Sequence, residues 1–500
     1  MPPEEAGHLS FALSVEGFAR EDFSVVDFSG REAMNELFSF RIRLVCEKQD
    51  IDPDNTLGRP VTFRIDSSRD GTHSTTPYHG TFSEFRVLHQ AIPYTFYEAV
   101  LVPRAHMLTR SMISEVYTSE KGIPDILEDL LKAEGLTSQD YSFGMSESYR
   151  SRSFVCRFEE SALSFVDRWA EREGIAYYFD HDDHKDRLVF FDHPSRKPSW
   201  KKSLSYRPPS ELDPGFSDDS LQEWSLRIVP LPHRIVVSDF NYRKANLEIE
   251  ESRILDPRGK GTVRAFGENT RTNAEAQRQA TILSEIHKVR EKTCEGKTTA
   301  TGIRAATTVH IKHHFRNDHN GTFFVTSVLH KGSQAAFLTS GFDVRSPKEQ
   351  RQTHYEATFV AIPSDVAFRP QRTTPWPRIP GVSSAIIEAE GSGLFAELSE
   401  YGEYKVRFPF IFGQKRSQKN SGWIRMATPL AGADNGMHFP LHKETEVMVA
   451  FLGGDPDQPV ILGAVHNSEH RALITNKNPG INVIRSIGGH SITLNDDGYA

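Results

Sequence analysis

Apolar and polar residues alternate over several short segments of the first hundred residues. Residues 38–45 read Phe-Ser-Phe-Arg-Ile-Arg-Leu-Val, the period of a strand with one buried face. Similar runs lie at 61–65 and 95–102, and Asp, Pro and Gly residues separate them as turns. The pattern predicts a strand-rich region over 9–110, and we expect a second one over 225–360.

The spacing changes to a helical period in three places. Residues 124–131 begin with a proline and are followed by Gly135, which predicts a helix with a glycine stop. Residues 163–172 carry one apolar face and lead into an apolar strand at 175–179. Residues 272–294 open with a Thr-x-x-Glu capping box and contain no Gly or Pro, so we predict the longest helix there.

Prolines concentrate between residues 363 and 381, and they predict a stiff, extended linker. Beyond it, Gly and Pro separate short runs that indicate strands at 403–412, 423–428, 446–452 and 460–465. A region of about 90 residues with roughly five strands fits a small barrel such as the OB-fold. A second short linker, 470–479, precedes a fragment from Ile481 onward that reads as two short strands.

Charge and cysteine usage narrow the class of protein. The net charge of -8 argues against a globally basic nucleic-acid binder, although a local basic patch remains possible. Cys46, Cys156 and Cys294 form no CxxC pair and no zinc spacing, which is typical of a protein that folds in a reducing cytosol. The polar, acidic N-terminus does not resemble a Sec signal, so export would need another route.

Histidines are densest in the segment 310–319, at His310, His313, His314 and His319. A zinc site needs three or four such groups to converge with the correct geometry. The segment instead lies between two strand-like runs, so we interpret it as an exposed hairpin loop.

Two other motifs are incomplete. Gly296-Lys297-Thr298 matches only the end of a phosphate loop, because Glu291 stands where the first glycine belongs and a helix precedes it. Gly488-Gly489-His490 resembles one unit of a calcium-binding repeat without its aspartate spacing. No GxSxG, HExxH or GxGxxG motif occurs in the sequence. We therefore assign no catalytic, cofactor-binding or metal-binding residue.

Several segments together resemble the VgrG family of type VI secretion and the related tail-hub and spike proteins of contractile phages: 158–175, 239–244, 401–408, 421–425 and 446–461. The last segment is the most specific, since it contains Phe451-Leu452-x-Gly454-Asp455-Pro456-Asp457-x-Pro459-Val460-Ile461. Its Gly, Pro and Asp residues each favour a tight turn. The segment 239–244 departs from the family pattern, because a proline usual near Asn246 is missing.

The resemblance implies an α+β, mainly β fold in four parts. A tail-hub-like domain with two β-barrel subdomains and helical insertions is expected over 1–370, and a Pro-rich linker over 371–381. An OB-fold neck follows over 382–469. A linker and the start of a trimeric β-helical needle occupy 470–500. Because the pattern stops midway at Ala500, we expect either a truncated chain or a short form that lacks most of the needle.

The resemblance also implies a mechanical function. Three chains with two barrels each would present a pseudo-sixfold ring to a hexameric, Hcp-like tube protein. A PAAR-type tip protein, baseplate subunits and cargo effectors are the other expected partners, and a target membrane is met only by puncture. No enzymatic activity and no cofactor are expected. Such a protein assembles in the bacterial cytoplasm and is then translocated or secreted without a Sec signal.

Two alternatives stay open, and a third is excluded. The same architecture serves as a phage baseplate hub. An OB-fold that binds single-stranded nucleic acid is the second alternative, because residues 404–433 lack acidic side chains and carry six cations: Lys405, Arg407, Lys415, Arg416, Lys419 and Arg425. Strand parity argues against it, since Tyr404, Val406 and Phe408 share the face opposite the cations. A spike with a lysozyme insert is the third, but the ten residues 470–479 are too few for a catalytic domain.

Overall fold

The computed structural model describes residues 8–48, 51–69, 72–118, 120–208, 219–334, 353–389, 393–411 and 421–496. The chain divides into two compact units. The first contains residues 1–111, 127–148 and 162–375, and the second contains residues 112–126, 149–161 and 376–500. No helix of the described residues is both long enough and apolar enough to cross a membrane.

The first strand-rich region closes into a six-stranded barrel. Its strands are β1 (His8–Val15), β2 (Ser24–Ala33), β3 (Ser39–Cys46), β4 (Pro60–Arg69), β5 (Thr72–Ala91) and β6 (Tyr94–Val102). They pair around the ring in the order β1-β2-β3-β6-β5-β4, and β4 pairs with β1 to close it. Alternate inward residues such as Phe28, Phe40 and Phe63 are buried and pack edge-on or tilted against one another.

A second barrel has the same ring order. Its strands are β12 (Lys201–Tyr206), β13 (Ser220–Ile228), β17 (Lys292–Thr298), β18 (Thr308–Lys312), β19 (Gly321–Ser333) and β20 (His354–Pro363). They pair as β12-β13-β17-β20-β19-β18, which is again first, second, third, sixth, fifth and fourth in chain order. One strand differs in direction: β12 runs parallel to both of its neighbours, whereas β1 is antiparallel to its own. The two predicted barrels are therefore confirmed.

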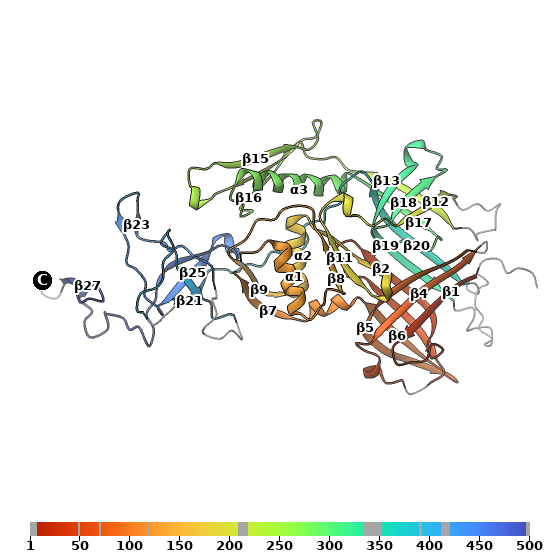
Figure 1. The fold of residues 1–500 in the computed structure, drawn as a ribbon, viewed down its shortest axis with the longest axis horizontal. Helices are drawn as coiled ribbons and strands as arrows, with labels where there is room; N and C mark the ends of the chain where they lie inside the picture. The colour runs from red at the N-terminus through yellow and green to blue at the C-terminus, as the bar shows by residue number, and fades with distance from the viewer. Residues whose placement is uncertain are drawn as a thin grey trace, which may run out of the picture. The chain divides into compact units, whose positions relative to one another are not determined.

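The second barrel begins at Lys201, earlier than the predicted boundary at residue 225. The prediction was wrong there because β12 reads Lys-Lys-Ser-Leu-Ser-Tyr, in which Leu204 alone is fully buried. The two barrels join where β2 pairs antiparallel with β19. In Figure 1 the red-to-orange strands β1–β6 and the green-to-cyan strands β17–β20 lie side by side.

Helices and two small sheets lie between the barrel strands in the sequence. They are α1 (Ile123–Ala133), α2 (Ala162–Glu173), α3 (Asn273–Glu291), the sheet of β8 (Tyr141–Gly144), β10 (Ala176–Asp180) and β11 (Arg187–Phe191), and the sheet of β14 (Arg234–Asp239), β15 (Ile249–Ile254) and β16 (Thr262–Phe266). Helix α3 covers the second of these sheets through Ile235, Val237, Ala276 and Ala280 (Figure 1).

The capping box of α3 forms as predicted, because the Glu275 amide donates to Thr272 Oγ1 over 3.2 Å. The predicted end at Cys294 was wrong: the helix stops at Glu291, and the next residues continue directly as β17. Pairing of β17 with both β13 and β20 overrides the helical period of its first residues.

The second unit contains a four-stranded sheet in the order β22-β21-β25-β26. The strands of this unit are β7 (Met112–Tyr117), β9 (Val155–Ser161), β21 (Val382–Glu388), β22 (Lys405–Arg407), β23 (Leu430–Ala431), β24 (Gly436–Met437), β25 (Glu446–Phe451), β26 (Pro459–Ala464), β27 (Ile481–Arg485) and β28 (Ser491–Asn495). Over its described residues, 403–411, the predicted strand 403–412 shortens to β22, because Pro409 has no amide proton to donate, and Phe412 lies outside the described residues. The predicted strand 423–428 reduces to single bridges at Ile424 and Met426.

Candidate functional site

Four buried polar side chains join the two barrels at the seam between β2 and β19. Glu32 Oε1 accepts from Tyr78 Oη over 3.0 Å and lies 3.0 Å from His330 Nε2. The other ring nitrogen of His330 lies 2.8 Å from Tyr355 Oη. Glu32 and Tyr78 come from the first barrel, and His330 and Tyr355 come from the second. The contact between Glu32 and His330 crosses the seam and so fixes one barrel against the other, and the two tyrosines hold these two side chains from within their own barrels.

Both tyrosines of this network stay protonated near neutral pH. Burial, with the Glu32 carboxylate nearby, raises the pKa of Tyr78 well above its usual value. Burial raises the pKa of Tyr355 in the same way. Buried polar groups of this kind specify a unique arrangement when every member is satisfied. These four residues belong to no sequence motif. Their one signal is that Glu32 and His330 occupy inward positions of otherwise apolar strand faces.

The family-specific turn in the second unit acts as an anchor. Gly453 and Gly454 adopt left-handed φ angles of 59° and 75°, which non-glycine residues rarely adopt. Asp455 Oδ1 accepts from Trp376 Nε1 and from the Asp457 amide, each over 3.0 Å. Asp457 Oδ1 accepts from the Cys156 amide over 2.6 Å. The turn thus holds both Trp376 of the Pro-rich linker and the strand β9, a role beyond the predicted tight turn.

The Pro-rich segment is tied to the first unit over its N-terminal part. Arg369 Nε donates to Glu285 Oε2 over 2.7 Å, and its Nη1 donates to the carbonyls of Gly174 and Asp192. The Glu171 carboxylate accepts from the amides of Thr373 and Thr374. Proline spacing predicted stiffness, but these side-chain contacts carry no sequence signal.

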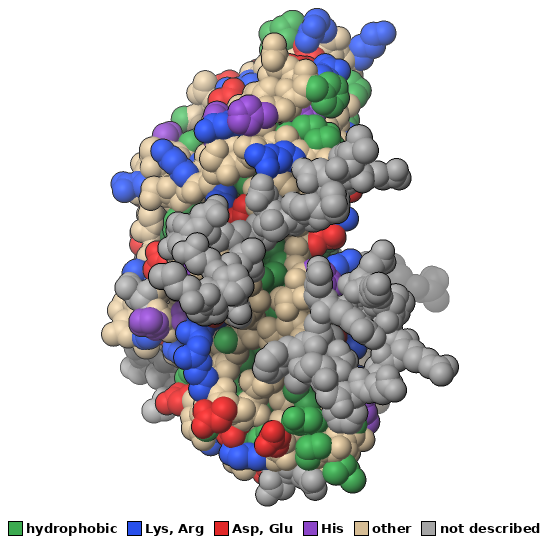
Figure 2. Space-filling view, turned by 90° about the vertical axis from the view of Figure 1, so that its right-hand side faces the viewer, with side chains coloured by type: hydrophobic (Ala, Val, Ile, Leu, Met, Phe, Trp, Pro, Cys, Tyr) green, Lys and Arg blue, Asp and Glu red, His purple; other side chains and the backbone are tan. Residues whose placement is uncertain are grey.

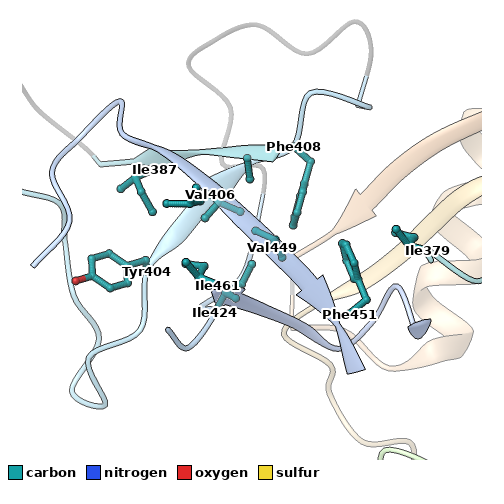
Figure 3. Packing of buried hydrophobic residues seen from close by; sticks show 11 residues of the cluster. Ile379, Ile387, Tyr404, Val406, Phe408, Ile424, Val449, Phe451 and Ile461 are labelled. Carbon is teal, nitrogen blue, oxygen red and sulfur yellow. The ribbon is translucent and has the colours of Figure 1, made fainter. Parts of the chain in front are cut away.

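In the neck, aromatic and aliphatic residues alternate with cations along the chain, and the apolar side chains form the core as predicted. Tyr404, Val406 and Phe408 are buried in one cluster with Val449 and Ile461 (Figure 3). The opposite face of β22 carries Lys405 and Arg407, and each of these two has an acidic partner. Lys405 Nζ lies 3.8 Å from a Glu397 oxygen and 4.4 Å from the Trp423 ring centroid. Arg407 lies 3.6 Å from Glu388 and 3.5 Å from Glu444.

These ion pairs leave less free positive charge than the sequence suggested. Lys415, Arg416 and Lys419 lie outside the described residues, as does Phe412. Figure 2 faces the barrels of the first unit rather than the neck, and the Lys and Arg side chains visible there are interspersed with acidic and hydrophobic ones.

Residues 313–319 of the histidine segment form the loop between β18 and β19, as predicted. The prediction of an exposed loop was wrong for His310, which belongs to β18, and for His314, which is 5% exposed. The His314 amide donates to Asn320 Oδ1 over 2.8 Å, and the rings of His314 and His319 stack at 4.6 Å. Arg316 and Asp318 form an exposed ion pair of 2.7 Å. Over the described ranges, no group of three or more His, Cys, Asp or Glu side chains is placed to hold a metal ion.

The remaining motif residues have structural surroundings. A Cβ atom on Gly296 would lie 2.6 Å from the Phe359 ring, so close packing inside the second barrel requires glycine there. Lys297 Nζ pairs with Glu356 over 2.9 Å. Gly488-Gly489-His490 lies in the turn between β27 and β28. All three cysteines are buried and free, and burial raises the pKa of Cys294 to about 12.

Comparison with known proteins identifies two matched regions. Residues 31–336 match the phage tail baseplate hub (GPD) family. Residues 401–466 match the type VI secretion system/phage-baseplate injector OB domain.

Relatives match nearly the whole chain. The type VI secretion system spike protein VgrG5 of Pseudomonas aeruginosa is 26% identical over 483 residues, which is 93% of this chain and 58% of that protein. VgrG4b of the same organism is similar to the same extent, so the chain spans less than two thirds of the length of these relatives.

A solved structure shows the same fold. The E. coli c3393 protein, a component of the type VI secretion system that is similar to the T4 tail proteins gp27 and gp5, superposes with a TM-score of 0.64 at 21% identity. The match covers 91% of this chain and 99% of that protein. The mainly β fold with a tail-hub-like region and an OB domain is thereby confirmed.

Proposed function

The chain belongs to the VgrG family of phage tail baseplate hub (GPD) proteins, and from this premise we propose that it is the hub and spike of a contractile injection machine. In this function the protein caps a tube and enters a target envelope when a sheath contracts. The relatives are named as spike proteins of type VI secretion, which supports that machine over a phage tail. Neighbouring sheath and tube genes would distinguish the two.

The duplicated barrel is the observation that carries this proposal. Two rings of identical strand order in one chain give a homotrimer six similar barrels. A hexameric tube protein could then contact a threefold hub without a mismatch in symmetry.

The C-terminal hairpin supports the needle part of the proposal. Strands β27 and β28 pair in register, yet Ile484, Ile492 and Leu494 are about half or more exposed. A hairpin with apolar residues on its surface needs partners, and two further copies would supply them.

We further propose that the protein works mechanically and has no catalytic step. A PAAR-type tip protein would bind beyond the needle, and baseplate subunits and cargo effectors would bind the hub. A solved Francisella PdpA-VgrG complex, matched with a TM-score of 0.63 at 10% identity, illustrates one such assembly in a relative of this fold. Assembly would take place in the bacterial cytoplasm, and firing of the machine would export the protein.

Secretion of the tube protein tests the function directly. In a producing strain without another hub gene, deletion of this chain should remove the tube protein from the culture supernatant, and the wild-type chain should restore it. A Tyr94→Phe chain is the matched control and should also restore it. Undiminished tube secretion in the deletion strain would contradict the proposal.

A further inference from the structure

The two barrels share irregularities as well as ring order. In β5 the register against β6 shifts between Phe82 and Glu84, and in β19 the register against β20 shifts between Val325 and Ser327. Pro60, the first residue of β4, pairs with Thr81, and Thr308, the first of β18, pairs with Phe324. Both landmarks align β5 with β19 in one register, in which residues 84–87 correspond to 327–330.

The second strands of the two barrels align in the same way. The register of β2 against β3 shifts between Val25 and Asp27, and that of β13 against β17 shifts between Leu221 and Glu223. In this alignment residues 226–229 correspond to 30–33 of β2.

The aligned strands differ in whether another strand pairs with their edge. Residues 30–33 of β2 pair with residues 327–330 of β19 inside the chain. The corresponding edges carry no strand among the described residues, since β5 pairs with β4 only as far as Thr81 and β13 pairs with β12 only as far as Leu221. Such an edge presents unpaired amide and carbonyl groups to another chain.

Side chains at the free edges are more exposed than the aligned side chains at the internal seam, because no neighbouring strand covers them. His330 is 1% exposed, whereas Val87, its counterpart on β5, is 51% exposed. Glu32 is 5% exposed, whereas Ile228, its counterpart on β13, is 62% exposed. Positions that are buried at the internal seam are therefore open and apolar at the free edges. Hydrophobic side chains also gather near the lower end of the face in Figure 2, the end where the β5–β6 hairpin lies in Figure 1.

We propose that a second copy of the chain fills this place: residues 226–229 of one copy pair antiparallel with residues 84–87 of the next, in the register of the internal seam. That register sets Leu226 opposite Val87 and Ile228 opposite Phe85. Both pairs lie on the face that is buried at the internal seam, so their apolar surface leaves water together.

The outer face of the proposed pairing carries Arg227 opposite Arg86. Both side chains are exposed, and Arg86 Nη1 lies 3.7 Å from Glu98 Oε1, which reduces the repulsion. The pairing ends before the second register shift of β5, between Val87 and His89.

The contact is head-to-tail, because each copy offers two different edges. Contacts of this kind form a ring when the rotation closes. Three copies would then give six barrels joined by one repeated strand pairing, alternately within and between chains. The proposal rests on the trimeric hub proposed above and specifies which strands hold it together.

Cysteine cross-linking tests the register in the full chain. Residues directly opposite in an antiparallel pair have Cα atoms about 4.5–5.5 Å apart, within disulfide reach. Diagonal neighbours are about 7–8 Å apart, at or beyond that reach. The variant Arg86→Cys/Arg227→Cys should form covalent dimers and trimers under mild oxidation. The matched control Glu84→Cys/Arg227→Cys, two residues out of register, should form at least tenfold less.

Mixing the single variants tests direction. Arg86→Cys mixed with Arg227→Cys should give covalent dimers, and neither alone should do so. Sedimentation of the same samples separates the two proposals. A trimer with no in-register link, or with equal linking in the control, would overturn the strand pairing and leave the trimeric hub intact. A monomer at every concentration would overturn both.

A surface substitution gives an independent readout that needs no disulfide. Val87→Asp should weaken self-association at least tenfold, because it places a carboxylate opposite Leu226. Ile254→Asp, at a position 64% exposed on β15, should leave association unchanged. Equal association of both variants and the wild-type chain would contradict the proposal.

Discussion

Glu32 and His330 are separated by 298 positions in the sequence, yet they form one hydrogen-bonded pair at the seam of two barrels. Neither residue belongs to a recognisable motif, whereas the denser histidine segment at 310–319 forms the end of β18 and the loop that follows it. Polar residues that hold two barrels together are thus recognised in the structure by their burial and their hydrogen-bond partners. A high number of histidines in a short segment of the sequence does not identify them. Their importance lies in the cost of leaving a buried partner unsatisfied.

Replacement of Tyr355 by Phe should test that cost. The change removes the hydroxyl 2.8 Å from His330 Nδ1 and leaves this nitrogen buried without its partner. We expect the first unit to lose about 1–2 kcal/mol of stability. Thermal unfolding would report a lower Tm, and Tyr94→Phe, at a half-buried position of β6, should leave it nearly unchanged. Equal Tm values for both variants would show that the network does not stabilise the seam.

Asp457 should hold β9 in the second unit. In Asp457→Ala the Cys156 amide loses its acceptor, a hydrogen bond to a charged group worth about 1.5–3 kcal/mol. Hydrogen exchange of residues 155–161 should therefore become faster. Asp434→Ala, at an exposed position of the same unit, should leave that exchange unchanged. Unaltered exchange in both variants would contradict the anchoring role.

Acid should destabilise the first barrel through His79. Burial, with His184 and Arg304 nearby, lowers the pKa of His79 to about 4 from an ordinary value of 6.5. Between these values the unfolded chain binds more protons than the folded one, so stability falls as the pH drops from 6.5 to 4. Unfolding midpoints measured across this range should vary less in His79→Gln. The control His89→Gln, at an exposed position of the same strand, should follow the wild-type curve.

Helices were easier to predict than strands at the scale of elements. The capping box and the glycine stops located all three helices to within a few residues, because these signals are local. Strands depend on neighbours that the sequence does not display. The strand β12 was not predicted, because Leu204 is its one fully buried residue. The strand predicted over 403–412 was too long, because the alternation of apolar and polar residues continues past Pro409 whereas β22 ends at Arg407. The four-residue network at the seam could not be predicted at all, since its members meet only after both barrels close.

Substitutions around the strand β22 would test whether its aromatic residues form a packed core or a platform on which nucleic-acid bases stack. Phe408 is 1% exposed within the cluster shown in Figure 3, so Phe408→Ala should cost about 3–5 kcal/mol. Phe439→Ala, at a 56% exposed position, should cost little. A nucleic-acid platform would instead show tight binding to single strands that falls steeply as salt rises. We expect weak binding at physiological salt, and submicromolar, salt-sensitive binding would reverse this interpretation.

At the scale of the whole molecule, the main feature is that the six-stranded barrel occurs twice in one chain. One chain contains the same six-stranded ring twice, and the rings differ mainly in the direction of their first strand and in what lies along their free edges. A threefold assembly of such chains acquires near-sixfold character without six identical subunits. The repeated unit is therefore the barrel, although the unit that associates is the chain.

The hub should contribute more to self-association than the C-terminal hairpin. Strands β27 and β28 have five residues each, and a two-stranded hairpin is marginally stable on its own. Ordering each residue costs about 1–2 kcal/mol of backbone entropy, which so little buried apolar surface offsets poorly. A chain of residues 1–469 should therefore associate within about tenfold of the 1–500 chain in sedimentation across a concentration series. Val87→Asp in either chain should weaken association further than the deletion does. If the deletion alone abolished association and Val87→Asp had no effect, the hairpin rather than the hub would hold the copies together.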